Sequence, residues 1–141
     1  MKIKSILLTL CLCAFAFAGP HSDGCVKNLV DQLKQAEYDK AFDAILDNSP
    51  FIMGTSNVAN IKMQYTAAFR NIEAQYGKPI GFQILGSKTL GTMERTGYLI
   101  QCEKSAWVLE VYEYNNPESK KQYIVGFKII GDDEAFNRYG V

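Results

Sequence analysis

The second half of the chain alternates apolar side chains with other side chains over four successive segments. These segments span residues 80–86, 93–104, 105–115 and 121–131, and Gly, Ser, Asn or Pro bounds each of them. Because successive side chains of a β-strand point to opposite faces, this period of two predicts four strands. The short connections between the segments predict antiparallel neighbours. The second half is therefore predicted to form one four-stranded antiparallel sheet.

One face of this predicted sheet is strongly apolar and must be covered by other elements. The second face mixes apolar and charged side chains, which suits a protein–protein contact better than open water. We therefore predict a homodimer through the second face, with Tyr112, Tyr114 and Ile124 in the contact. The positions assigned to the apolar face are Ile80, Phe82, Ile84, Tyr98, Ile100, Cys102, Trp107, Leu109, Val111, Tyr123, Val125, Phe127 and Ile129.

Three segments of the first half carry apolar residues at helical spacing, within residues 25–36, 38–46 and 58–76. Gly77 and Pro79 end the third segment, because Gly favours the position after a helix and Pro cannot continue one. Three amphipathic helices are thus available to cover the apolar face of the sheet. The predicted fold class is α+β, with three N-terminal helices packed on a four-stranded antiparallel sheet.

Residues 1–18 have the pattern of an export signal. A short basic head precedes an apolar run, and the small residues of its Ala-Phe-Ala ending predict cleavage before residue 19. Residues 19–24 are then expected to be a flexible leader, and residues 25–141 a single domain. We expect a periplasmic or secreted protein, with an uncleaved anchor as the alternative. No later segment is apolar enough to span a bilayer.

Cleavage would also remove two of the four cysteines and leave Cys25 and Cys102. In an oxidising compartment two thiols are interpreted first as a disulfide, which we predict here. The long loop between them would give this bond about 4 kcal/mol of stabilisation in the chain-entropy model. The alternative is two buried thiols, each acting as a small apolar side chain.

Several chemistries lack the residues they need. The 15 basic and 15 acidic residues balance, and the basic ones do not cluster as a nucleic-acid surface requires. His21 is the only histidine, so one His and two Cys leave no structural zinc set and no base for a nucleophilic Ser or Cys. No phosphate-binding loop is present. We expect no metal, no cofactor and no nucleic-acid partner.

Three helices followed by a four-stranded sheet resemble the layout of the NTF2-like superfamily, in the cystatin-like fold group. The resemblance rests on residues 38–52, 76–91, 96–114 and 123–136, and it is closest to small exported bacterial members of uncharacterised function. It implies a curved sheet that forms a cone with the helices. It also implies a pocket between the helices and the sheet, into which enzymes of this fold place Asp, His or Tyr.

Few ionisable side chains are expected to face that pocket. Glu113 and Tyr98 are the candidates, with Glu113 as a base at the pocket mouth and Tyr98 donating a hydrogen bond. The alternative places Glu113 in solvent at a strand end and makes the tyrosines ordinary core residues. The residues expected to line the pocket are Tyr65, Phe69, Tyr98, Trp107 and Tyr123.

The shortage of inward ionisable groups favours a non-catalytic function. We expect an exported module that binds a small apolar ligand or a partner protein, as a dimer. The alternative is a small-molecule isomerase, lyase or hydrolase that uses the same pocket.

Overall fold

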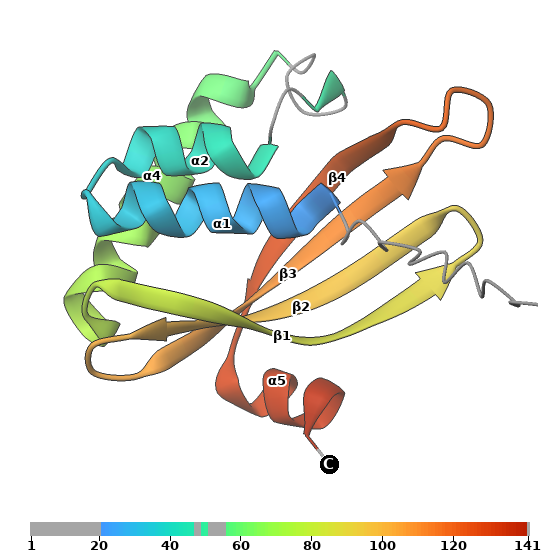
Figure 1. Ribbon diagram of the computed structural model, residues 1–141. Coiled ribbons are helices and arrows are strands. Elements are labelled where there is room, and N and C mark those ends of the chain that lie inside the picture. The colour runs from blue at the N-terminus through green and yellow to red at the C-terminus, as the bar shows by residue number, and fades with distance from the viewer. Residues whose placement is uncertain (1–20, 47–48, 51–55, 141) are drawn as a thin grey trace, which may run out of the picture.

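The computed structural model describes residues 21–46, 49–50 and 56–140. Within these residues the helices of the first half precede the four strands, and a further helix follows them (Figure 1). The elements are α1 (His21–Lys34), α2 (Tyr38–Leu46), α4 (Val58–Tyr76), β1 (Pro79–Leu90), β2 (Met93–Cys102), β3 (Ala106–Asn115), β4 (Gln122–Ile130) and α5 (Asp132–Tyr139).

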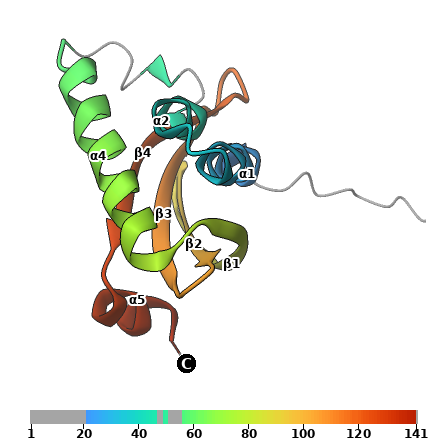
Figure 2. The same ribbon diagram turned by 90° about the vertical axis from the view of Figure 1, so that its left-hand side faces the viewer.

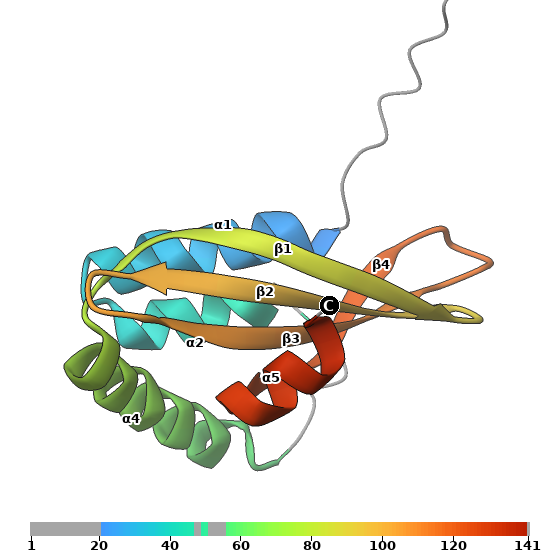
Figure 3. The ribbon, with the colours of Figure 1, turned by 90° about the horizontal axis from the view of Figure 1, so that it is seen from below.

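The strands form one antiparallel sheet in the order β1-β2-β3-β4, which confirms the predicted sheet and the α+β fold class. Helices α1 and α2 lie on its inner face, and α4 packs beside them (Figure 2). Helix α5 lies on the opposite, outer face, as the view from below shows (Figure 3). Both faces of the sheet are therefore in contact with helices.

Helix α1 begins earlier than the sequence predicts. The expected leader, residues 19–24, overlaps the helix, because α1 starts at His21. Asp23 lies in the first turn, where a carboxylate interacts favourably with the unpaired N–H groups of the helix end. The rest of the predicted leader and the predicted export signal lie outside the described residues.

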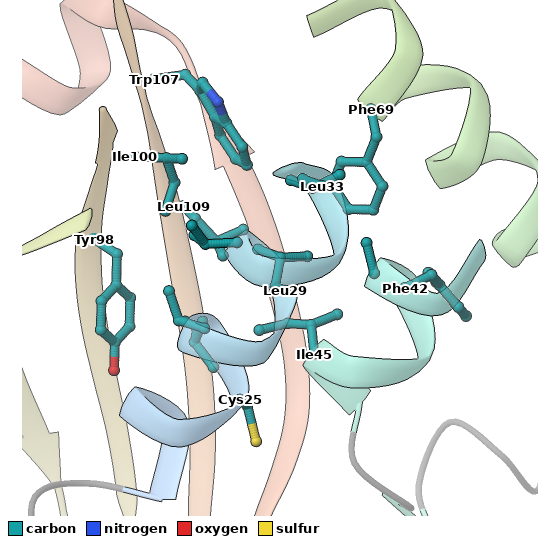
Figure 4. Packing of buried hydrophobic residues seen from close by; sticks show 14 of the residues in the cluster. Cys25, Leu29, Leu33, Phe42, Ile45, Phe69, Tyr98, Ile100, Trp107 and Leu109 are labelled. Atoms are coloured by element: carbon teal, nitrogen blue, oxygen red, sulfur yellow. The ribbon is translucent and has the colours of Figure 1, made fainter. Parts of the chain in front are cut away.

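The main core lies between the inner face of the sheet and the three helices (Figure 4). Leu29 and Leu33 of α1 reach toward the sheet, and Phe42 of α2 and Phe69 of α4 close the layer behind them. The residues of the predicted apolar face that are buried in this core are Tyr98, Ile100, Cys102, Trp107, Leu109 and Val111. Phe82, Phe127 and Ile129 pack against it and are partly buried.

A β-bulge in β4 changes which residues face the core. Tyr112 pairs with Gly126 and Glu113 pairs with Ile124, so Val125 is left without a partner in the ladder. Ile124 is therefore turned inward and is 1% exposed, and it does not share the outer face with Tyr112 and Tyr114 as predicted. Tyr123 pairs with Tyr114 of β3, so its predicted inward position is wrong for the same reason.

No disulfide joins Cys25 and Cys102, so the predicted bond is wrong. Both thiols are buried, which agrees with the alternative interpretation. Cys25 lies near the start of α1, whereas Cys102 ends β2, two residues after Ile100, which pairs with Trp107. Trp107 and Cys25 lie at opposite ends of the core in Figure 4. The two sulfur atoms therefore lie at different levels of the core, and burial raises the pKa of the Cys102 thiol.

Gly97 lets α5 approach the outer face of the sheet. A Cβ atom at this position would overlap Cζ of Tyr139, so only glycine leaves room for the tyrosine ring. We predict that Gly97→Ala displaces Tyr139 and lowers the free energy of unfolding by roughly 1–2 kcal/mol. Urea denaturation measures this. The matched control is Gly126→Ala in β4, where a Cβ atom meets nothing within 4 Å; equal effects of the two changes would contradict the prediction.

Candidate functional site

The two candidate acid–base residues are buried at the first turn of α1. Tyr98 is 0% exposed and Glu113 is 1% exposed, so Glu113 does not lie in solvent at the strand end. The backbone N–H of Ser22 donates to Oε2 of Glu113 at 2.8 Å. The hydroxyl of Tyr98 donates to Oδ1 of Asp23 at 2.6 Å. We call Ser22, Asp23, Tyr98 and Glu113 the α1 corner.

Ser22 connects Tyr98 with Glu113, which make no hydrogen bond to each other among the described residues. Since the single hydroxyl proton of Tyr98 goes to Asp23, the Ser22 hydroxyl is the donor in its 2.7 Å bond to the Tyr98 oxygen. Ser22 therefore donates to Tyr98 through its side chain and to Glu113 through its backbone. The structure brings the two candidates together through the helix rather than as a direct pair.

The carboxyl group of Glu113 is in an unfavourable environment for a charge. Burial raises its pKa above the ordinary value, and the hydrogen bond from Ser22 offsets part of this effect. The charge of His21 lowers the pKa further, while the charges of Glu94 and Asp23 raise it. Its Oε1 atom is buried and has no hydrogen-bond partner among the described residues. Burial, then the bond to Asp23, also raises the pKa of Tyr98, which stays a proton donor.

On the outer face a second buried carboxylate fastens α5 to the sheet. Glu110 of β3 is 0% exposed. Nη1 of Arg138 donates to both of its oxygens, at 2.8 and 2.7 Å. The hydroxyls of Tyr139 and Tyr112 donate to it at 2.8 and 2.9 Å. Burial alone would raise the pKa of Glu110, but these hydrogen bonds outweigh burial and hold the pKa below its usual value.

A groove lies between α5 and the outer face of the sheet, with a volume of about 360 Å³. The sheet contributes Leu85, Leu99 and Val108, and α5 contributes Phe136 and Tyr139. Phe136 is 76% exposed although it lines this groove. Tyr139 donates its proton to Glu110, and burial followed by that bond raises its pKa to about 12. We call this feature the α5 groove. The sequence analysis did not predict it, because α5 has few apolar side chains that would indicate packing against the sheet.

The other predicted pocket residues are part of the packed core. The Tyr65 ring lies with its centroid 4.5 Å from that of Phe127 and 6.3 Å from that of Phe69. Trp107 is buried among the sheet and helix side chains of Figure 4. None of the five predicted pocket residues lines the α5 groove. Of the predicted dimer face, Tyr112 and Tyr114 are half-buried on the outer face, and Tyr112 is hydrogen-bonded to Glu110.

Comparison with known proteins identifies the fold. No protein-family model matches this chain, and no curated protein matches it in sequence. Among solved structures, it is similar to a Campylobacter jejuni chain that carries the name of an NTF2-like transpeptidase. That match has a TM-score of 0.53 at 12% sequence identity and covers 74% of this chain and 96% of the other. The chain has an NTF2-like fold.

This NTF2-like domain has no described group of three or more His, Cys, Asp or Glu residues that could hold a metal ion. None of its described helices is both long enough and apolar enough to cross a bilayer. Among the described residues, the fully buried carboxyl group on the inner face of the sheet is that of Glu113, in the α1 corner. The α5 groove, in contrast, lies on the outer face of the sheet.

The ion pair beneath α5 leads to a pH-dependent prediction for the NTF2-like domain. Because the folded pKa of Glu110 is depressed, the stability that its charge contributes is present at neutral pH and is lost as pH falls through that pKa. We predict that Glu110→Gln lowers the free energy of unfolding by roughly 3 kcal/mol at pH 7. The gap to wild type should narrow at pH 3, as followed by urea denaturation. The exposed Glu118→Gln is the control; a gap that is constant with pH would contradict the prediction.

The α1 corner leads to a second prediction. Tyr98→Phe leaves the Ser22 hydroxyl and the Asp23 carboxylate without the phenol that joins them. We expect the free energy of unfolding to fall by about 1–3 kcal/mol, with earlier hydrogen exchange at the start of α1. Tyr65→Phe is the control, because the Tyr65 hydroxyl makes no hydrogen bond to the described residues. If both variants lose the same stability, the corner does not hold the helix.

Proposed function

We propose that this chain is an exported, non-catalytic NTF2-like module that binds a small apolar ligand in the α5 groove. The export signal expected from residues 1–18 would place the mature domain in the periplasm or outside the cell. The observation that carries the binding proposal is the combination of a groove of about 360 Å³ with Phe136, a largely exposed aromatic residue on its wall.

The size and chemistry of the groove support a small ligand. Pockets for small molecules enclose about 300–1,000 Å³, are mostly apolar and carry a few polar groups that orient the ligand. The α5 groove has apolar walls from Leu99, Val108 and Phe136, and polar groups at Ser105 and Asp132. Covering the exposed ring of Phe136 would remove apolar surface from water, which contributes about 25 cal/mol per Å².

The hydrogen bonds that hold α5 beside the groove favour binding over catalysis. Glu110 lies below Tyr139, but its two oxygens are engaged by Arg138, Tyr139 and Tyr112. A general base needs an acceptor that can reach the substrate. Tyr139, the tyrosine that lines the groove, already donates its hydroxyl proton to Glu110. The acidic side chain in the lining is that of Asp132.

One observation favours a second candidate function, a small-molecule isomerase, lyase or hydrolase that uses Glu113. A buried carboxyl group with a raised pKa, next to a tyrosine that stays protonated, is a common acid–base arrangement. Against it, Glu113 and Tyr98 are both buried and both hold the first turn of α1. Loss of a measured activity in Glu113→Gln, with the fold retained, would favour this candidate.

The binding proposal is tested with a neutral apolar dye, N-phenyl-1-naphthylamine, titrated by fluorescence. Phe136→Ala should raise the dissociation constant of the dye roughly tenfold, since removing the ring costs the complex about 1–2 kcal/mol of apolar contact. Met63→Ala is the matched control, because Met63 is 65% exposed on α4 and does not line the groove.

Two results would contradict the proposal. The first is equal dye affinity in wild type, Phe136→Ala and Met63→Ala. The second is a wild-type dimer in light scattering that Phe136→Ala converts to a monomer, which would make a second copy of this chain the occupant of the groove.

A further inference from the structure

A second pocket lies on the outer face of the sheet, near the β1–β2 hairpin, and has a volume of about 440 Å³. Lys88 of β1, Arg95 of β2 and Tyr112 of β3 line it. These three residues are direct neighbours across the sheet, because Lys88 pairs with Arg95 and Arg95 pairs with Tyr112. This end of the sheet extends past α5 in Figure 3. We call this feature the hairpin pocket.

The two cations of the hairpin pocket lack the anionic partners that the other charges of the outer face have. Two carboxylates and two cations beneath α5 form ion pairs with one another: Glu110, Glu134, Lys128 and Arg138. Nε of Arg95 lies 3.8 Å from Oε1 of Glu110, which is too long for a hydrogen bond, and the Arg95 guanidinium makes no hydrogen bond to the described residues. Lys88 is exposed and forms no ion pair with the described residues. The pocket therefore carries an excess of positive charge.

The position of these cations favours an anion between them. Lys88 and Arg95 are directly opposite each other in the ladder, where like charges destabilise a sheet. A bound acid group would relieve this repulsion and would accept hydrogen bonds from the guanidinium of Arg95, whose planar fork matches such groups. Glu94 also lines the pocket, but it alternates with Arg95 along β2 and pairs with Glu113 of the inner face.

The other walls of the hairpin pocket suit an apolar group. Leu90 and Met93 line it from the two strands of the hairpin, and Leu90 is 83% exposed. The hydroxyl of Tyr112 donates to Oε2 of Glu110 at 2.9 Å, which holds the tyrosine ring in place beside the pocket. A ring that is already ordered can cover an apolar group with little further loss of rotamer freedom. The volume lies within the range of about 300–1,000 Å³ that small-molecule sites have.

We propose that the hairpin pocket binds an amphipathic organic anion. Its acid group lies between Lys88 and Arg95, and its apolar body lies against Tyr112 and Leu90. The site is separate from the α5 groove, with which it shares no lining residue. A second copy of this chain is a poorer occupant, because a two-fold contact would place the cations of both copies in one interface.

Two dyes that differ by one acid group test this proposal. The anion 8-anilinonaphthalene-1-sulfonate has the same aromatic skeleton as the neutral N-phenyl-1-naphthylamine. Both dyes are titrated by fluorescence against wild type, Lys88→Gln, Arg95→Gln and Lys34→Gln. Lys34→Gln is the matched control, because Lys34 is an exposed lysine of α1 that lines neither the hairpin pocket nor the α5 groove.

The anionic dye should respond to the two cations of the pocket. We expect Lys88→Gln and Arg95→Gln each to raise its dissociation constant roughly three- to tenfold, since each removes a contact with the charged group. Lys34→Gln should leave that constant unchanged, and none of the three changes should alter binding of the neutral dye. Sodium chloride at about 0.5 M should weaken binding of the anionic dye to wild type more than to Lys88→Gln, because salt screens exposed charges.

Four results would overturn the proposal. The first is no binding of the anionic dye to wild type. The second is an equal loss of its binding in Lys34→Gln and Lys88→Gln, which would indicate an effect of net charge alone. The third is a loss in Phe136→Ala with wild-type affinity in Lys88→Gln, which would place the anion in the α5 groove. The fourth is a wild-type dimer that Leu90→Glu converts to a monomer, with dye binding unaffected by Lys88→Gln. If Arg95→Gln does not fold, Lys88→Gln decides, because Lys88 is exposed.

Discussion

Removal of the sheet's inner face from water is the constraint on which the rest of the structure depends. Tyr98, Ile100, Leu109 and Val111 form an apolar surface on the two central strands, and such a surface is not stable in contact with water. Helices α1, α2 and α4 cover it, and their side chains complete a single core. Because this packing sets where α1 lies, it also sets where the first turn of α1 meets Glu113 and Tyr98.

The outer face is covered in a different way. Helix α5 has eight residues, too few to be stable as an isolated helix in water. Apolar contacts of Ala135 with Val108 and Ile130 form only a small cluster. The hydrogen bonds of Arg138 and Tyr139 to the buried Glu110 provide further stabilisation of α5 on the sheet. The same attachment leaves the α5 groove open beside it, so the candidate binding site is a result of a charge-based rather than an apolar anchor.

Repeating patterns made much of the fold predictable. A period of two in the second half and a helical period in the first half gave the four strands and the three covering helices, together with most of the inner-face residues. The bulge at Val125 was not predictable, since β4 alternates without interruption and the irregularity arises from its pairing with β3. It reversed the expected faces of Tyr123 and Ile124. The disulfide was predicted from the expected oxidising compartment and from the number of cysteines, which carry no information on the distance between the two sulfur atoms.

The candidate site was only partly accessible to sequence reasoning. Glu113 and Tyr98 have the correct parity for the inner face, but burial of Glu113 depends on α1 starting at His21, where no apolar periodicity indicates a helix. A glutamate within a strand, such as Glu110, is equally consistent with a solvated position. Its partners Arg138 and Tyr139 lie in α5, a helix of eight residues with few apolar side chains at helical spacing.

The covering of the outer face by α5 has a consequence for how the chain is made. Helix α5 follows the four strands along the chain, so it is synthesised after them. Until then the inner core can assemble, but Leu99 and Val108 remain uncovered on a nearly finished sheet. A chain interrupted between β4 and α5 would therefore leave apolar surface on the outer face of the sheet in contact with water.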